Sequence, residues 1–266
     1  MDDIQRNSDT ADAINAGIAL AGVRNVEGMP VAIVPDGSHI VKMENILPQP
    51  LRKRGLWVLH SAASFIDLVN EEKLPSTRIY SDASSRTFVA VFNDHGNMPG
   101  WRDHRAVYAC PVSPEWSAWT GKDGRQMSQV DFAQFIEANL PDMAEPPAAD
   151  MLEISRSLEA KKKVNFASGI RLSNGQNELT YEEEISGTAA KGKLQVPEIF
   201  TIGIPVLEGG ERYAVQARLR YRIQDGGRLT IWFELVRPHK VLEDAINNVR
   251  GEIAEKTQLK VFAGAA

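Results

Sequence analysis

Residues 86–142, RTFVAVFNDHGNMPGWRDHRAVYACPVSPEWSAWTGKDGRQMSQVDFAQFIEANLPD, hold the densest run of aromatic and ionisable side chains in the chain. They include three of the five tryptophans and two of the five histidines. No complete catalytic motif occurs among them. The stretch therefore indicates how the protein is built more directly than it indicates a reaction.

A β-loop-β unit opens the stretch. Alternating runs rich in β-forming residues predict strands at Thr87–Phe92 and Arg105–Val112. Between them, residues 93–100 (NDHGNMPG) are types that favour turns. We therefore expect two strands joined by a long loop that is suited to a functional role.

Two helices are expected after this unit. Ser113 can cap the first, and Pro114 fits its first helical position. Ser128 can cap the second, where Asp131 complements the helix dipole and Pro141 ends the amphipathic pattern.

A specific set of residues in this stretch matches a known family pattern: Pro99–Ala106 (PGWRDHRA), Glu115-Trp116 with Trp119, and Met127 with Asp131–Ala133 and Phe135–Glu137. In these positions the chain resembles the YfdQ-like proteins of bacteriophages and prophages, a family of uncharacterised function. The resemblance implies a phage-encoded intracellular protein whose genes often lie near phage recombination functions. It supplies no catalytic residues.

The rest of the chain favours an α+β fold. Alternating runs predict five antiparallel strands in the C-terminal half, with Asn174-Gly175 as a hairpin turn, and a helix follows Pro238. The predicted strands are Val164–Leu172, Glu178–Ile185, Ile199–Leu207, Tyr213–Ile223 and Leu229–Val236. We expect a mixed, β-rich N-terminal region with helices, and a C-terminal antiparallel meander sheet covered by helices.

The best domain boundary lies in Asp142–Asp150, where Pro146-Pro147 forces extended backbone between two helical patterns. This divides the chain into an N-terminal α+β region, residues 1–145, which holds the tryptophan-rich motif, and a C-terminal sheet with its helix, residues 146–266.

The first 72 residues predict smaller elements. The sequence predicts a helix of small residues at Asp9–Leu20, with too few apolar side chains to fill a core face. This helix is therefore expected to dock on another surface, such as that of another subunit. A hairpin is expected from Pro30–Val34 and His39–Met43. Leu56–Leu59 predicts a strand and Ser61–Glu72 a helix.

Composition bears on the compartment and on partners. The single cysteine, Cys110, agrees with a reducing environment, and no apolar run approaches the roughly 20 residues of a spanning helix. We therefore expect a protein of the bacterial cytoplasm, without membrane contact. A net charge of −5 argues against a broadly basic nucleic-acid binder.

Two Asp-His pairs in the loop, Asp94-His95 and Asp103-His104, are the candidates for metal binding or proton transfer. A metal nuclease would use such ligands to activate water. Neither pair has a recognised ligand spacing, however, so turn and hydrogen-bonding roles are favoured. No catalytic residue, metal site or cofactor is predicted.

One strand face carries the candidates for nucleic-acid binding, Arg218, Arg220 and Arg222. Pairing with acidic residues on neighbouring strands is favoured over phosphate contacts. The candidate acids are Glu182, Glu184 and Glu234.

Trp101, Trp116 and Trp119 are the candidates for partner binding, because large aromatic side chains are enriched at protein interfaces. Stacking on single-stranded bases is the weaker interpretation, since interleaved cations are missing. Core packing also accounts for them.

Two functional hypotheses remain. The favoured one is an intracellular phage or prophage protein without catalytic activity, which forms a homo-oligomer or binds a host or phage protein. The alternative is an accessory of phage DNA recombination that binds nucleic acid or cuts it with a metal ion.

Overall fold

The computed structural model describes residues 17, 24–26, 29–31, 47–160, 165–185, 188–224 and 227–266. Its contacts divide the chain into two units, residues 1–53 and 54–266. In the first unit, β1 (Arg24–Val26) and β2 (Met29–Val31) pair antiparallel. Apart from Gly17, which is helical, the predicted helix Asp9–Leu20 lies outside the described residues, as does the predicted strand His39–Met43.

The second unit begins with a mixed five-stranded sheet, in the order β15-β4-β5-β6-β3. Its central strands β4, β5 and β6 run antiparallel, whereas β3 is parallel to β6 and β15 is parallel to β4. The strands are β3 (Gly55–Leu59), β4 (Arg78–Asp82), β5 (Thr87–Val91), β6 (His104–Ala109) and β15 (Val261–Ala263).

Serine caps start three helices of this unit. Ser113 and Ser128 are the predicted caps, and the third is Ser61, the first residue of the helix predicted over Ser61–Glu72. Ser61, Ser113 and Ser128 each accept a hydrogen bond from the backbone N–H three residues later, which satisfies an otherwise unpaired donor of the first turn. The helices are α2 (Ala62–Glu72), α3 (Pro114–Lys122) and α4 (Gln129–Ala138).

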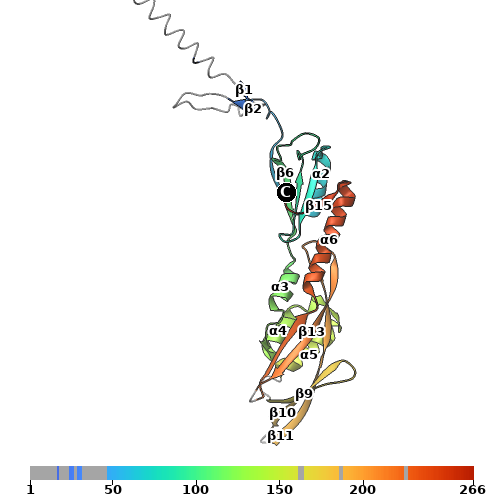
Figure 1. Ribbon diagram of the computed structural model, residues 1–266. Helices are drawn as coiled ribbons and strands as arrows, with labels where there is room; N and C mark the ends of the chain where they lie inside the picture. Colours follow the sequence, from blue (N-terminus) through green and yellow to red (C-terminus); the bar gives the residue numbers. More distant parts are fainter. Residues whose placement is uncertain are drawn as a thin grey trace, which may run out of the picture. The chain divides into compact units, whose positions relative to one another are not determined.

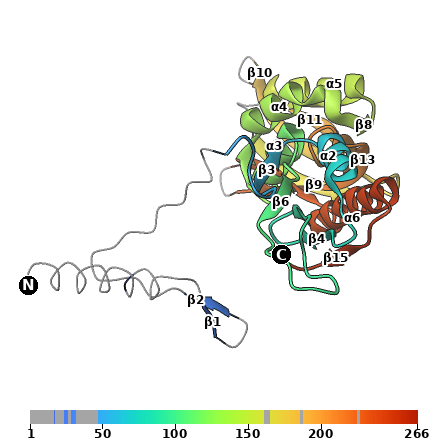
Figure 2. The same cartoon turned by 90° about the horizontal axis from the view of Figure 1, so that it is seen from above.

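A second five-stranded sheet is antiparallel throughout, in the order β7-β14-β13-β12-β8. Helices α3 and α4 pack on it, and α5 (Ala148–Ala160) lies beside α4 (Figure 2). The strands are β7 (Met127–Ser128), β8 (Met143–Glu145), β12 (Ile199–Pro205), β13 (Arg212–Ile223) and β14 (Leu229–Leu235). A short 3-10 turn, η2 (Leu140–Asp142), leads into β8.

A separate three-stranded sheet, β11-β10-β9, is formed by β9 (Asn165–Arg171), β10 (Gln176–Ile185) and β11 (Thr188–Pro197). The Asn174-Gly175 turn is confirmed between β9 and β10, with Gly175 in the left-handed region at φ 79°. The five predicted strands are thus present and antiparallel, but they divide between two sheets. The sequence did not predict β11, because TAAKGKLQVP has small residues and lysines in place of a clear apolar alternation.

The final helix, α6 (Pro238–Thr257), packs against α2 and contacts β13 and β15 (Figure 1). It therefore touches both five-stranded sheets, and the chain after it returns to the first sheet as β15. One connected cluster of buried side chains runs through the described part of this unit, from Phe65 and Phe88 in the first sheet region to Trp119, Phe200 and Phe233 in the second. The α+β class is confirmed.

The predicted division at residues 145 and 146 falls at the end of β8. Both five-stranded sheets take strands from each side of that point, since β7 and β8 join later strands and β15 joins earlier ones. The division stays a prediction. Within the described residues, no helix combines the length and the apolar character needed to cross a membrane.

Candidate functional site

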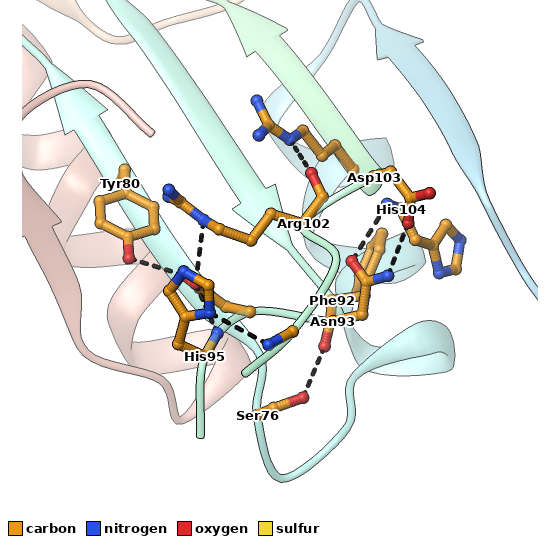
Figure 3. A network of polar contacts seen from close by, with 11 residues as sticks. Ser76, Tyr80, Phe92, Asn93, His95, Arg102, Asp103 and His104 are labelled. Atoms are coloured by element: carbon orange, nitrogen blue, oxygen red, sulfur yellow. Dashed lines mark hydrogen bonds and ion pairs between the residues drawn. The ribbon is translucent and has the colours of Figure 1, made fainter. Parts of the chain in front are cut away.

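The loop between β5 and β6 is anchored by one asparagine. Asn93 donates through Nδ2 to Asp103 Oδ1 at 2.9 Å, and its Oδ1 accepts from the backbone N–H of His104 at 3.1 Å. Figure 3 shows Asn93 facing both residues across the neck of the loop. Because the two ends are bonded together, the loop leaves and re-enters the sheet at a fixed position.

Asp94 is the central buried charge of the loop, with 2% of its surface exposed. Its Oδ2 accepts from the Tyr80 hydroxyl at 2.6 Å, and its Oδ1 accepts from the backbone N–H of His95 at 2.7 Å. Arg102 Nε lies 3.1 Å from Oδ1. Burial by itself raises the pKa of this carboxyl, but the bonds from Tyr80 and His95 and the Arg102 charge outweigh it and lower the pKa.

Backbone geometry holds Arg102 in place. The residue has φ 57°, in the left-handed region that a non-glycine side chain rarely adopts, and its backbone N–H donates to the Asn93 carbonyl at 3.2 Å. Its guanidinium lies 5.8 Å from the centre of the Tyr80 ring. The salt bridge to Asp94 and this cation–π contact therefore accompany an unfavourable backbone conformation.

Gly100 fits where no side chain could. A Cβ at this position would lie 2.2 Å from the Asn93 carbonyl oxygen and 2.5 Å from that of Asp94. The backbone N–H of Gly100 donates to His95 Nδ1 at 3.0 Å. The close approach thus lets the loop fold back on its own first residues.

The structure does not bring the two Asp-His pairs together as a metal site. His104 is buried and its ring packs 4.7 Å from that of Phe92, on the opposite side of Asn93 from His95 (Figure 3). In the described ranges, no three His, Cys, Asp or Glu side chains are grouped so that they could hold a metal ion. The contacts of Asp94, His95 and Asp103 instead fix the loop.

The three candidate tryptophans occupy different environments. Trp101, in the loop, is 78% exposed. Trp116 and Trp119 are buried in α3, where the Trp119 ring makes an edge contact with Phe135 at 4.9 Å and its Nε1 donates to Asp142 at 2.8 Å. Core packing therefore accounts for Trp116 and Trp119, and only Trp101 presents a large surface.

The arginine face of β13 is partly neutralised within the sheet. Arg220 Nε lies 3.0 Å from Glu234 Oε2 on β14, and this hydrogen bond lowers the pKa of Glu234. Arg218 is directly opposite Glu234 in the strand register and contributes to the same shift. Of the three predicted acidic neighbours, Glu234 lies on β14, which pairs with β13. Glu182 and Glu184 belong to β10 in the three-stranded sheet.

A cleft of about 630 Å³ lies where α5 meets β8, β11 and β12. Three carboxylates line it, Glu145, Asp150 and Glu153. This negative lining opposes the binding of nucleic-acid phosphates at the cleft.

The edge strand β3 was not predicted as a site. Its three central residues expose large parts of their surface: Leu56 61%, Trp57 50% and Val58 60%. Its inner edge pairs with β6, and no strand lies beside its outer edge in the part of the chain that the structure describes. The sequence predicts a strand at Leu56–Leu59, but only the sheet order shows that this strand is at an edge.

Several other edge strands of the described residues are protected in ways that β3 is not. β7, β8 and β15 are only two or three residues long, and the edge strand β11 contains two lysines and a terminal proline. Short strands, lysines and prolines are the common devices against edge-to-edge pairing. The β3 sequence, GLWVL, has five residues and none of these charges or prolines.

Comparison with known proteins gives a family and no activity. The sequence model of a family described as "Uncharacterized conserved protein (DUF2303)" matches residues 6–266. No curated protein and no solved structure matches the chain.

Proposed function

The chain belongs to this family of uncharacterized conserved proteins (DUF2303), and we propose that the protein acts by association and not by catalysis. It forms a homo-oligomer or binds a protein partner in the cytoplasm of a bacterial host, as a phage or prophage protein. The phage origin and the intracellular location rest on the resemblance of residues 99–106 and of the tryptophan-rich segment to YfdQ-like proteins.

The exposed outer edge of β3 is the observation that carries this proposal. An edge strand presents a row of backbone donors and acceptors that another strand can complete. Leu56, Trp57 and Val58 add apolar surface to that edge. Together they provide the hydrogen bonds and the desolvation that drive association.

The central loop supports an association role as well. Its ionisable residues are engaged in fixing the loop, as the bonds of Asp94 to Tyr80 and His95 show. The loop also exposes Met98 and Trp101, two apolar side chains of the kinds that are enriched at protein interfaces. A rigid loop that displays apolar side chains suits recognition of a protein surface.

The nucleic-acid alternative receives less support from the arginine face of β13. Arg220 is paired with Glu234, so part of the positive charge is already neutralised. The chain also has a net charge of −5. Phosphate contacts would therefore fall to the remaining arginines of this face, Arg218 and Arg222.

Light scattering during size-exclusion chromatography, over a range of protein concentrations, tests the proposal. We expect the wild-type mass to exceed that of one chain and the Val58→Lys variant to shift towards the monomer, because a lysine on an edge strand opposes pairing. Ile170→Lys is the matched control, since Ile170 is 57% exposed on the edge strand β9. The control should keep the wild-type mass.

A nucleic-acid binding titration tests the alternative function. We expect weak binding at physiological salt, unchanged when Arg218, Arg220 and Arg222 are all replaced by Gln. Tight binding that the triple variant loses, with a salt slope that falls by about 0.7 to 0.9 per lost phosphate contact, together with a monomeric wild type, would replace the proposed function by the alternative.

A further inference from the structure

The direction of the backbone groups in β3 follows from its pairing with β6. The Gly55 N–H donates to the Asp103 carbonyl at 2.8 Å, so the backbone groups of Gly55 point towards β6. In a strand these directions alternate from residue to residue. The N–H and C=O groups of Leu56 and Val58 therefore point outwards, to the edge without a neighbouring strand.

The faces of the side chains follow from the same register. Trp57 lies opposite Ala106, which is buried, and Val58 lies opposite Val107 on the other face of the sheet. Leu56 shares the face of Val58, because side chains alternate along a strand. The edge is thus apolar on both faces.

We propose that the partner of β3 is β3 of a second copy of this chain, paired antiparallel about a two-fold axis through Trp57. The inference rests on the proposed function and specifies its partner and its register. An interface made by one surface with itself closes as a dimer under two-fold symmetry, and this symmetry makes paired edge strands antiparallel when the axis is perpendicular to the sheet.

This register matches the strand to itself in three respects. Leu56 lies opposite Val58 of the second copy, and Val58 opposite Leu56, so both pairs are apolar. Both residues point their backbone groups outwards, so each pair exchanges two hydrogen bonds. Trp57 meets its own copy at the position without hydrogen bonds, where side chains are closest and aromatic pairs stabilise a sheet.

The expected dimer is reversible. Two five-residue strands and their side chains fall short of the roughly 1,200 Å² at the lower end of stable interfaces. The dimer fraction should therefore rise with concentration and should decrease when a charge is placed on the edge.

Disulfide trapping of the full chain tests the register. Trp57→Cys places two sulfurs opposite each other at a pair with a Cα separation of about 4.5 Å, within the range that a disulfide spans. We expect a doubling of mass on a non-reducing gel after mild oxidation. Wild-type protein is the control, because its single cysteine, Cys110, is buried.

A second pair of variants retains Trp57 in case its loss prevents association. Leu56→Cys and Val58→Cys should each give little cross-linking alone, because identical positions are then diagonal neighbours, roughly 7 to 8 Å apart. A mixture of the two variant proteins should cross-link, because the thiol that replaces Leu56 in one chain then lies opposite the thiol that replaces Val58 in the other.

The possible outcomes separate the register from the function. The wild type could associate while Leu56→Cys or Val58→Cys cross-links better alone than in the mixture. That result overturns the register centred on Trp57 but leaves self-association intact. A wild type that associates without cross-linking at any of these positions excludes β3 as the interface. A monomeric wild type with no cross-linking overturns the inference together with self-association.

Discussion

The central loop shows how single residues fix a backbone path. Asn93 joins the two ends of the loop, Asp94 accepts bonds from Tyr80 and His95, and Arg102 pairs with Asp94 from a left-handed backbone conformation. The bonds from Tyr80 and His95 satisfy the buried carboxylate of Asp94, which would otherwise be costly to bury. The Asp and His residues thus have a structural explanation.

Gly100 permits the first prediction at this scale. Gly100→Ala should lower the free energy of unfolding by about 1 to 3 kcal/mol, because backbone atoms block the space that the new methyl group needs. Gly96→Ala is the matched control, since a Cβ at Gly96 meets the Ser76 side chain at an ordinary 3.6 Å. Urea unfolding of both variants measures the difference. Equal stability of the two variants would contradict the close approach at Gly100.

Asp94 gives a prediction on pH. Asp94→Asn should cost about 1 to 3 kcal/mol at pH 7, because an amide cannot accept all the bonds that the carboxylate accepts. The pKa of Asp94 is lower in the folded protein than its ordinary value of 3.8. Its charge therefore stabilises the fold above that value, and this stabilisation is lost as the pH falls through the folded-state pKa.

Urea midpoints of wild type and Asp94→Asn, measured from pH 7 down to pH 3, check this dependence. The gap between the two proteins should narrow at the acid end. Asp82→Asn is the control, because Asp82 also has a lowered pKa, from bonds to Ser84 and Ser85, but lies at the surface. A gap that stays constant over the whole range would show that the Asp94 charge does not stabilise the fold.

Individual elements were predictable where local chemistry decides them. The serine caps of α2, α3 and α4 stand next to their helices in the sequence, and the Asn174-Gly175 turn defines a hairpin by itself. The partners of a strand depend on contacts between residues far apart in the chain. This is why the sequence predicted the strand Leu56–Leu59 and missed that β3 lies at a sheet edge, parallel to β6.

The same dependence on contacts between distant residues explains why the sequence could not place the three tryptophans. Trp101, Trp116 and Trp119 cluster in the sequence, yet the exposed one lies in the loop and the buried ones lie in α3. Trp116 and Trp119 are three residues apart in α3 and so share a face of the helix. The sequence could not show that Trp119 packs against Phe200 and Phe233 of the second sheet, which are more than 80 residues away in sequence.

At the scale of the whole molecule, the described part of residues 54–266 has one connected core. The first five-stranded sheet needs β15 from the C-terminus, and the second needs β7 and β8 from before residue 146. Shared sheets and a shared core couple the folding of the two regions, because removing either region leaves unpaired edges and exposed apolar faces.

This coupling yields the last prediction, which tests the division at residues 145 and 146. A protein of residues 54–266 should unfold in one cooperative transition in urea, with fluorescence and circular dichroism giving the same midpoint. A protein of residues 146–266 should show no cooperative transition, because it lacks β7, β8 and the covering helices α3 and α4. Cooperative unfolding of the shorter protein would instead establish the division as a true domain boundary, and the shared strands would then be additions to a sheet that is already stable.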